Sequence, residues 1–541
     1  MFHHKPIQEM VIYQIYTRSF KDSNGDGVGD LAGVTEKLEY LSSLGVDMLW
    51  LSPFCSSPND DMGYDISDYQ NIMVEMGSME DLERLLEEAH KRNIGIMMDL
   101  VLNHSSDEHP WFVESRSSRD NPKRDWYIWA DEPNNWDSYF CPEAWELDEK
   151  TGQYYLHIFG VKQPDLNWRN QELREEIFRM VEWWLEKGID GLRLDAIHLI
   201  GKPEGNPDYV HAPGESKQFC HFRNHELGHK YIQELHKRVF SRYHPVTVGE
   251  TGGSTPQSAR LYVDKARHEF DMIFHLGFLE EGEFEENPAR NYKKFYEKWY
   301  EQLSQEGWDA VFLGNHDLAR MVSVIGDEER YWKESATCLA TMILTQWGTP
   351  FLYQGDEIGM VNAGFTSLDQ FRDPHTTIKY RVAEEKGQDT EKVLADIIKW
   401  GRDNSRTPMQ WDDSAHGGFS EAEPWIMMAR NWQHINVARQ EADPCSVLSY
   451  YKKAIAMRKS NPCLSYGRME MEKSDPAVFA YRRSHEGCSV LVVLNLSSSP
   501  AAFNMKAFNK DQILLSNYPG IRQNVSGLFL RPWESLVVKD R

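Results

Sequence analysis

Three carboxylates stand where short apolar runs of the sequence end. Asp195 follows "GLRL", Glu250 follows "PVTVG" and Asp317 follows "DAVFLGNH". A pair of carboxyl groups can hydrolyse a glycosidic bond, because one attacks or stabilises the anomeric carbon while the other protonates the leaving oxygen. If strands bring these side chains to one edge of a sheet, the sequence predicts a centre for glycoside hydrolysis there.

Arg193 lies two positions before Asp195 in an otherwise apolar run. Side chains two apart in a strand point to the same face, so Arg193 and Asp195 look the same way. One interpretation is a structural salt bridge, which also occurs near strand ends. The other is a nucleophile that Arg193 keeps ionised, with Glu250 carrying a pKa that desolvation raises after its apolar run.

The elements that must position these residues follow a strand and helix rhythm. Helical patterns such as 78–93, with Ser78 as N-cap, and 173–188, which stops at Gly188, lie between apolar runs. Continuous apolar runs predict buried parallel strands, and eight of them alternating with helices predict an α/β fold, a (β/α)8 TIM barrel. The active site of such a barrel lies at the carboxyl ends of its strands. The runs start at Val11, Asp47, Ile94, Gly191, Pro245, Phe270, Asp309 and Thr349.

Three further segments do not fit the barrel rhythm. The gap 105–170 is too long for a loop after the third strand, so it predicts a small inserted domain. A second insertion, 361–424, follows the eighth strand, and the short strand patterns of 465–541 predict a C-terminal antiparallel β domain. The barrel itself is expected to span 1–104 and 171–464.

The composition of the whole chain narrows the function classes. The 541 residues carry a formal net charge of -25, which argues against nucleic acid and anionic membrane surfaces as partners. No apolar run is long enough for a signal peptide or a membrane span, so we expect a cytoplasmic protein. Seven cysteines without metal-binding spacing indicate reduced thiols. We expect a small-molecule substrate and a monomer.

Several short blocks carry a family resemblance. They are "DLVLNH" (99–104), "GLRLDAIH" (191–198), "TVGET" (247–251) and "FLGNHD" (312–317). These four blocks resemble those of the α-amylase family, glycoside hydrolase family 13, and occur in the family's order. "QPDLNW" further resembles the block that marks the oligo-1,6-glucosidase and α-glucosidase branch, and the likeness runs almost end to end.

The resemblance implies a role for each matching residue. Asp195 would be the nucleophile, Glu250 the general acid/base, and Asp317 the carboxylate that binds ring hydroxyls. Arg402, with Asp61 and Tyr64, would close the pocket and hold the far side of the glucose, and Arg406 is the alternative for the arginine in this role. A pocket closed on the glucose side means an exo-acting enzyme. The implied glucose-binding residues are Asp61, Tyr64, His104, Arg193, His316 and Arg402.

Two metal-like patterns are present. In "DSNGDGVGD" the spacing resembles the first part of an EF-hand loop, although its twelfth position is Gly33 and not Glu, and the alternative is a solvated acidic turn. The resemblance implies a structural Ca²⁺ or Mg²⁺ there, remote from the chemistry. "HELGH" (225–229) matches a zinc-protease pattern, but the pattern is short enough to occur by chance in a long chain with 20 histidines, and no third ligand is indicated nearby. The predicted ligands of the first loop are Asp22, Asn24, Asp26, the Val28 carbonyl and Asp30.

Three departures from the family pattern concern the leaving group. Ala196 stands where oligo-1,6-glucosidases usually have Val, Gly252 where dextran-cleaving relatives have Trp, and His375 where those enzymes use Glu. We therefore predict a retaining α-glucosidase that favours α-1,4 substrates such as maltose. The alternatives are an oligo-1,6-glucosidase, a trehalose-6-phosphate hydrolase, or a barrel partner protein that has lost catalysis.

Overall fold

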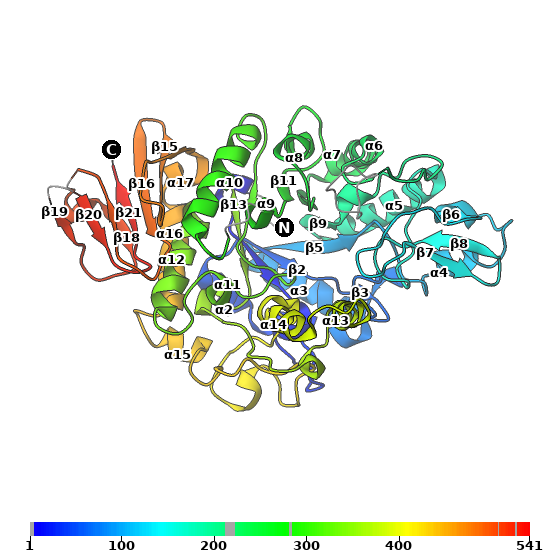
Figure 1. Cartoon of the computed structure of the whole chain (residues 1–541), viewed down its shortest axis with the longest axis horizontal. Coiled ribbons are helices and arrows are strands. Elements are labelled where there is room, and N and C mark those ends of the chain that lie inside the picture. Colours follow the sequence, from blue (N-terminus) through cyan, green and yellow to red (C-terminus); the bar gives the residue numbers. More distant parts are fainter. Residues whose placement is uncertain (1–4, 211–221, 281–283, 507, 525–526, 541) are drawn as a thin grey trace.

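The computed structural model of the chain, shown in Figure 1, describes residues 5–210, 222–280, 284–506, 508–524 and 527–540. A sheet of eight short, almost entirely buried strands lies at its centre, and each strand falls inside one of the predicted apolar runs. The strands are β1 (Ile12–Ile15), β2 (Met48–Leu51), β5 (Gly95–Val101), β9 (Gly191–Asp195), β10 (Val246–Glu250), β11 (Met272–Phe274), β12 (Ala310–Val311) and β13 (Thr349–Tyr353).

The strand order is that of a barrel. It runs β11-β10-β9-β5-β2-β1-β13-β12, all neighbours are parallel, and the two end strands contact each other, so the sheet closes on itself. The predicted (β/α)8 barrel is confirmed. The register places Arg193 of β9 beside Asp99 of β5 and Val248 of β10. This register therefore places Arg193 next to the Asp99 carboxylate, a pairing that the sequence alone does not predict.

Helices cover the outside of the barrel, with apolar stripes turned to the strands. α3 (Met79–Lys91) begins after Ser78, whose hydroxyl accepts the Asp81 N–H, and α5 (Gln171–Lys187) ends at Gly188, whose φ of 105° favours glycine. Within the described residues, no helix combines the length and apolarity needed to cross a membrane. The other barrel helices are α1 (Leu31–Glu36), α2 (Leu38–Leu44), α6 (Glu226–Leu235), α7 (Ser241–Tyr243), α8 (Pro256–Val263), α9 (Gly277–Glu280), α10 (Pro288–Leu303), α11 (Met321–Val324), α12 (Trp332–Thr345), α15 (Val437–Glu441) and α16 (Val447–Lys459).

Three excursions from the barrel reach its carboxyl-end face. The hairpin β3 (Cys55–Ser56) and β4 (Asp68–Ile72) follows β2. After β5 come α4 (Pro110–Ser115) and an antiparallel sheet of β6 (Trp129–Ala130), β8 (Gln153–Leu156) and β7 (Trp145–Asp148). After β13 come the paired helices α13 (Pro374–Glu385) and α14 (Thr390–Trp400). The domain boundaries given above stay predictions.

The C-terminal part is an antiparallel β domain, as predicted. Figure 1 shows its strands in orange and red at one end of the molecule, beside α12, α16 and α17 (Pro462–Tyr466). A sheet of order β14-β15-β16-β21-β18 lies with a second sheet of order β17-β20-β19 around its own apolar core. The strands are β14 (Arg468–Met471), β15 (Val478–His485), β16 (Cys488–Asn495), β17 (Ala501–Phe503), β18 (Ile513–Ser516), β19 (Gln523–Asn524), β20 (Gly527–Leu530) and β21 (Ser535–Lys539).

Candidate active site

A cavity of about 170 Å³ opens at the carboxyl ends of the barrel strands. Asp195 is the last residue of β9 and Glu250 the last of β10. The structure brings nine of the sequence-predicted residues to this one cavity. They are Asp61, Tyr64, His104, Asp195, Ala196, Glu250, Gly252, Asp317 and Arg402.

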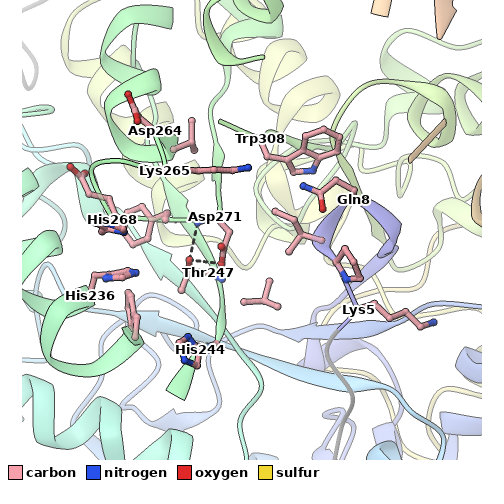
Figure 2. A pocket seen from close by; sticks show the side chains of 18 residues that line it. Lys5, Gln8, His236, His244, Thr247, Asp264, Lys265, His268, Asp271 and Trp308 are labelled. Atoms are coloured by element: carbon pink, nitrogen blue, oxygen red, sulfur yellow. Dashed lines mark hydrogen bonds between the residues drawn. The ribbon is translucent and has the colours of Figure 1, made fainter. Parts of the chain in front are cut away.

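A larger cavity, of about 640 Å³, lies at the opposite end of the barrel (Figure 2). Its lining includes Val246 and Thr247 at the start of β10, and the Thr247 hydroxyl donates to Asp271 over 2.9 Å. None of the predicted catalytic carboxylates lines it. Because the amino-end face of such barrels serves stability and the carboxyl-end face serves catalysis, the smaller cavity is the candidate active site.

One guanidinium group, that of Arg193, holds three carboxylates. Its Nη1 donates to Asp195 Oδ1 and to Asp99 Oδ1, each over 2.6 Å, and its Nη2 donates to Glu250 Oε2 over 2.6 Å. Arg193 itself is buried, with 2% of its surface exposed. The nucleophile and acid/base candidates are thus fixed on the two ends of one rigid planar group.

Burial and charge act in opposite directions on these carboxylates. Burial raises the pKa of Asp195 well above its usual range, Glu250 and Asp99 add to this, and Arg193 lowers the pKa. Burial likewise raises the pKa of Asp99 to about 6, against the lowering effect of Arg193. The predicted pairing with Arg193 accounts for the lowering effect on the pKa of Asp195, whereas the raising effect comes from burial. Without this arginine the buried group would retain its protons even more strongly.

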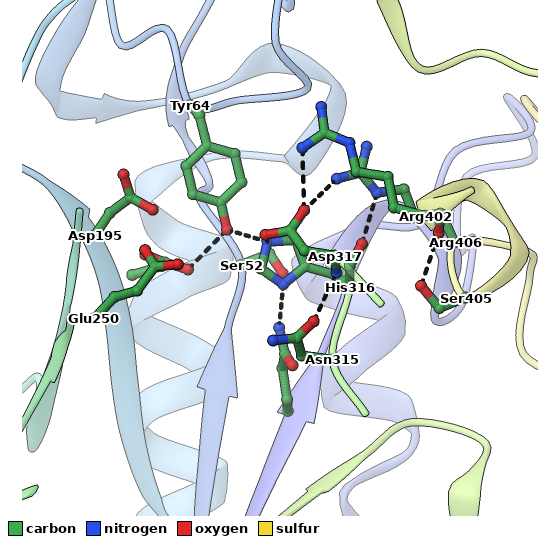
Figure 3. A network of polar contacts seen from close by, with 12 residues as sticks. Ser52, Tyr64, Asp195, Glu250, Asn315, His316, Asp317, Arg402, Ser405 and Arg406 are labelled. Atoms are coloured by element: carbon green, nitrogen blue, oxygen red, sulfur yellow. Dashed lines mark hydrogen bonds and ion pairs between the residues drawn. The ribbon is translucent and has the colours of Figure 1, made fainter. Parts of the chain in front are cut away.

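Asp317, unlike Asp195, lies beside two arginine side chains and a histidine. Arg406 Nη2 and Arg402 Nη1 donate to Asp317 Oδ1 over 2.8 and 3.1 Å, and His316 Nε2 lies 3.2 Å from Oδ2 (Figure 3). Burial would raise the pKa of Asp317, but His316, Arg402 and Arg406 outweigh it and hold the pKa far below its usual range. Asp317 is therefore a permanent anion, suited to accepting hydrogen bonds from hydroxyl groups.

Tyr64 connects the carboxylates that Arg193 holds with the surroundings of Asp317. Its hydroxyl donates to Asp99 Oδ2 over 3.0 Å and lies 2.5 Å from His316 Nε2, and its ring stacks on that of His316 with centroids 5.5 Å apart. Arg193 and His316 lie beneath the residues that line the cavity and contact them. These two predicted pocket residues hold the pocket residues in place and do not themselves line the cavity.

Both arginine candidates contact Asp317, but they differ in position. Arg402 lines the cavity and also pairs with Asp373 over 2.7 Å and with Asp61 over 3.2 Å. Arg406 is 1% exposed and does not line it. Burial raises the pKa of Asp61 to about 6, while Arg402 lowers it. Arg402 therefore links three carboxylates, as Arg193 does on the other side of the pocket.

The chain turns sharply just after the nucleophile candidate. Ala196 has φ 43°, in the left-handed region that non-glycine residues rarely adopt, and its N–H donates to Glu250 Oε2 over 3.0 Å. A carbonyl oxygen can only accept a hydrogen bond, so His198 carries its proton on Nδ1 and donates it to the Glu250 carbonyl over 3.0 Å. Burial lowers the pKa of His198 to about 3, so this imidazole is neutral.

Sequence reasoning missed the aromatic rim of the cavity. Tyr139, Phe140 and Phe159 come from the insertion after β5 and line the cavity. Phe140 lies against His375, with ring centroids 5.0 Å apart, and Arg402 lies 5.8 Å from the Phe140 ring centroid. The density of aromatic residues in 105–170 was the available signal, but it does not tell rim from core.

The predicted metal loop is closed by its own hydrogen bonds. Asp22 accepts the N–H groups of Asn24, Gly25 and Gly27, whereas Asp30 caps α1 by accepting the Gly33 N–H over 2.7 Å. Burial would raise the pKa of Asp22, but the Ser420 hydroxyl and these amides outweigh it and lower the pKa. In the described parts of the chain, no cluster of three or more His, Cys, Asp or Glu side chains is arranged to hold a metal ion.

The "HELGH" side chains have separate partners. His225 accepts the Leu227 N–H and caps α6, Glu226 pairs with Lys230 on the surface, and His229 contacts Glu269 over 2.7 Å. A zinc-protease site needs both histidines on one ion with the glutamate beside it. This geometry does not support such a site.

Comparison with known proteins agrees with the geometry. Residues 14–467 match the family model described as "Alpha amylase, catalytic domain", and residues 478–537 match "Alpha-amylase SusG C-terminal domain". An oligo-1,6-glucosidase of Parageobacillus thermoglucosidasius is 45% identical, over 99% of both chains. A trehalose-6-phosphate hydrolase of Bacillus subtilis (strain 168) is 41% identical, over 98% of both chains.

A solved structure of a trehalulose synthase mutant has a TM-score of 0.93 and 42% identity, and the match covers 98% of this chain and 99% of that one. Family model, relatives and fold agree over almost the whole length. The chain belongs to the alpha-amylase family of glycoside hydrolases, in the oligo-1,6-glucosidase branch.

Proposed function

We propose that the enzyme is a retaining, exo-acting α-glucosidase that releases glucose from the non-reducing end of short α-glucosides. The observation that carries this is the pair Asp195 and Glu250 on one guanidinium, at the floor of a small cavity. At about 170 Å³ the cavity is smaller than the roughly 300 to 1,000 Å³ of common ligand pockets. It suits one sugar ring and not a long chain.

In the proposed reaction, Asp195 attacks the anomeric carbon while Glu250 gives its proton to the leaving oxygen, which forms a β-glucosyl ester on Asp195. Glu250, now a carboxylate, then takes a proton from water, and that water displaces Asp195 and releases α-glucose. Asp317 would accept hydrogen bonds from ring hydroxyls throughout. Retaining enzymes keep the two carboxyl groups about 5 to 5.5 Å apart, and a shared guanidinium holds them at short range.

For linkage, we propose a preference for α-1,4 bonds, on the basis of the wall beside the nucleophile. An α-1,6 bond adds a rotatable CH2 between the rings, so the leaving sugar can swing away from that wall, whereas an α-1,4 bond keeps it closer. Ala196 leaves this wall without branched methyl groups. A Cβ added to Gly252 would meet only His198 Cε1, at 4.0 Å, so the neighbouring wall is open as well.

An oligo-1,6-glucosidase is the second candidate, because the relative from Parageobacillus thermoglucosidasius is named so. A trehalose-6-phosphate hydrolase is less well supported by the site. A phosphate would need a cation to pair with. Among the described residues that line the cavity, Arg402 alone is a cation, and three carboxylates already hold it.

The linkage proposal is tested by kcat/KM for maltose and isomaltose in the wild type and in Ala196→Val. The wild type should prefer maltose, and the valine variant should lose preference for maltose by about 5- to 150-fold, since a few methyl groups in a pocket discriminate by about 1 to 3 kcal/mol. Ala196→Ser is the control, because it adds one atom without branching. A wild type that prefers isomaltose, or an unchanged ratio in the valine variant, would contradict the proposal.

The left-handed φ of Ala196 disfavours a branched side chain. Melting temperatures of both variants are therefore needed beside the rates. Sucrose, trehalose and trehalose 6-phosphate complete the substrate panel, and hydrolysis of the last above that of maltose would favour the phosphate-directed alternative.

We further propose that Asp22, Asn24, Asp26 and the Val28 carbonyl hold a structural Ca²⁺ or Mg²⁺. Asp30, the fifth ligand predicted from the sequence, is left out of this set because it caps α1. Oxygen donors at alternating positions, with Asp22 kept ionised, suit a hard cation. Chelation should then lower the melting temperature by about 2 to 4 °C and leave the rate of the folded enzyme unchanged. The measurement is thermal melting with and without excess EDTA, with elemental analysis. Equal melting and no bound metal would refute the proposal.

A further inference from the structure

Two cysteine side chains meet at the junction between the barrel and the C-terminal β domain. Cys463 lies in α17 and Cys488 is the first residue of β16. Their Sγ atoms are 2.7 Å apart. The two thiols are thus placed closely enough to react with each other.

Regular structure fixes both cysteines. Cys488 pairs with His485 across the two-residue turn Glu486–Gly487 of the β15–β16 hairpin, and the His485 carbonyl accepts its S–H over 2.9 Å. Cys463 follows Pro462 at the start of α17, where the Asn461 side chain accepts its N–H. Neither sulfur therefore needs a backbone rearrangement to reach the other.

The two thiols differ in access to solvent. Cys488 is partly exposed and lines a groove of about 930 Å³, whereas Cys463 is 1% exposed. Burial and then the neighbouring Cys488 raise the pKa of Cys463 to about 11. A reagent from solvent would therefore react with Cys488 first, whereas the buried Cys463 thiol is in reach of the Cys488 sulfur and shielded from reagents in solvent.

We propose that Cys488 and Cys463 form a peroxide-sensitive pair that closes to a disulfide. The Cys488 thiolate attacks one oxygen of a hydroperoxide, which gives a sulfenic acid and releases water or an alcohol. The Cys463 sulfur, losing its proton, then attacks the Cys488 sulfur and expels the sulfenic oxygen as water. In sum, two thiols and one hydroperoxide give one disulfide, and the peroxide is the group reduced.

The disulfide would join α17 to the central hairpin of the C-terminal domain. α17 also contacts the turn Ile7–Glu9 that precedes β1, on the side of the barrel away from the catalytic cavity. The bond would close a short loop, since the cysteines are 25 positions apart, and restrict the unfolded chain more than the folded one. Its effect should be on stability at the domain junction and not on hydrolysis.

The test treats the wild type, Cys463→Ser, Cys488→Ser and Cys445→Ser with one equivalent of hydrogen peroxide. Cys445 is exposed, which makes its variant a matched control. The wild type and the control should lose two free thiols and two hydrogen atoms in mass, and their melting temperature should rise by about 3 °C. Neither variant of the pair should show the rise, and dithiothreitol should reverse it.

Trapping of sulfenic acid in the Cys463→Ser variant tests the same chemistry in a second way. Its Cys488 should stop at sulfenic acid, which dimedone traps, whereas wild-type Cys488 should escape dimedone. Peptide mapping that finds no Cys463–Cys488 bond in the wild type, or equal dimedone labelling of both proteins, would overturn the proposal. Hydrolysis of maltose serves as a check that all four proteins are folded.

Discussion

Replacing Asp195 by alanine is expected to lower kcat by roughly 10⁴- to 10⁶-fold, as the loss of a covalent nucleophile does in other enzymes. The fold should persist, because the carboxylate ends strand β9 at the cavity and Arg193 keeps two other partners. Rates on 4-nitrophenyl α-glucoside and melting curves of the same samples measure the two effects. A variant that melts like the wild type and retains a tenth of its activity would rule out Asp195 as the nucleophile.

The anomeric form of the products provides an independent test of the role of Asp195. Azide fits the space that the carboxylate leaves, and attack from that face should restore turnover and produce a β-glucosyl azide. In the wild type, NMR should show α-glucose as the first product. First release of the β anomer would make the mechanism inverting.

Glu250→Gln is the matched partner of the alanine variant. It removes the proton donor of the first step, so kcat/KM for maltose should fall far more than kcat/KM for a nitrophenyl glucoside, whose leaving group needs no proton. Equal losses of kcat/KM on both substrates would assign Glu250 a structural role.

Replacing Arg193 by glutamine should move the acid limb of the pH–rate profile to higher pH by about 1 to 3 units. The direction of this shift follows from what surrounds Asp195. Burial raises the pKa of Asp195 and Arg193 lowers it, so removal of the cation leaves the raising effects of burial, Glu250 and Asp99. Asp195 then becomes an ionised nucleophile only at higher pH, and kcat at neutral pH falls accordingly. The measurement is kcat/KM for maltose from pH 4 to pH 9.

Removal of a buried charge from three carboxylates also costs stability, about 3 to 5 kcal/mol for a broken buried pair. Arg193→Lys keeps the charge but loses the planar fork, so its limb should move less and in the same direction. Arg320→Lys is the control, since Arg320 is equally buried, at 2% exposed, and contacts neither Asp195 nor Glu250. An unchanged limb in folded Arg193→Gln would show that Arg193 does not set the protonation of the nucleophile.

The barrel could be predicted because its determinants are local. A continuous apolar run such as the one starting at Ile94 becomes a strand buried on both faces, and the polar residue after each run marks its carboxyl end. These marks alone predict that Asp195, Glu250 and Asp317 lie at one face of the barrel.

What the sequence did not reveal depends on register and on distant insertions. Asp99 joins Arg193 only because β5 and β9 pair in one register, and Asp373 joins Arg402 from a segment outside the motif that contains Arg402. The left-handed turn at Ala196 carries no sequence mark, since alanine is not a residue that favours it. The raised pKa of Asp195 follows from burial, which a motif does not encode.

The cavity is formed partly by the barrel strands and partly by insertions that follow them. Its floor stands on barrel strands, whereas Phe140 and His375, which meet at the rim, belong to two insertions more than two hundred positions apart in the chain. Exchange of the insertion after β5 can reshape the place of the leaving sugar and leave the ion pairs of Arg193 untouched. Exchange of the insertion after β13 would also replace Arg402 and its pairs with Asp61 and Asp317. The evolutionary consequence is modularity: a lineage with this architecture can acquire new acceptors or new linkages by rewriting the insertion after β5, while the machinery for bond cleavage is inherited intact.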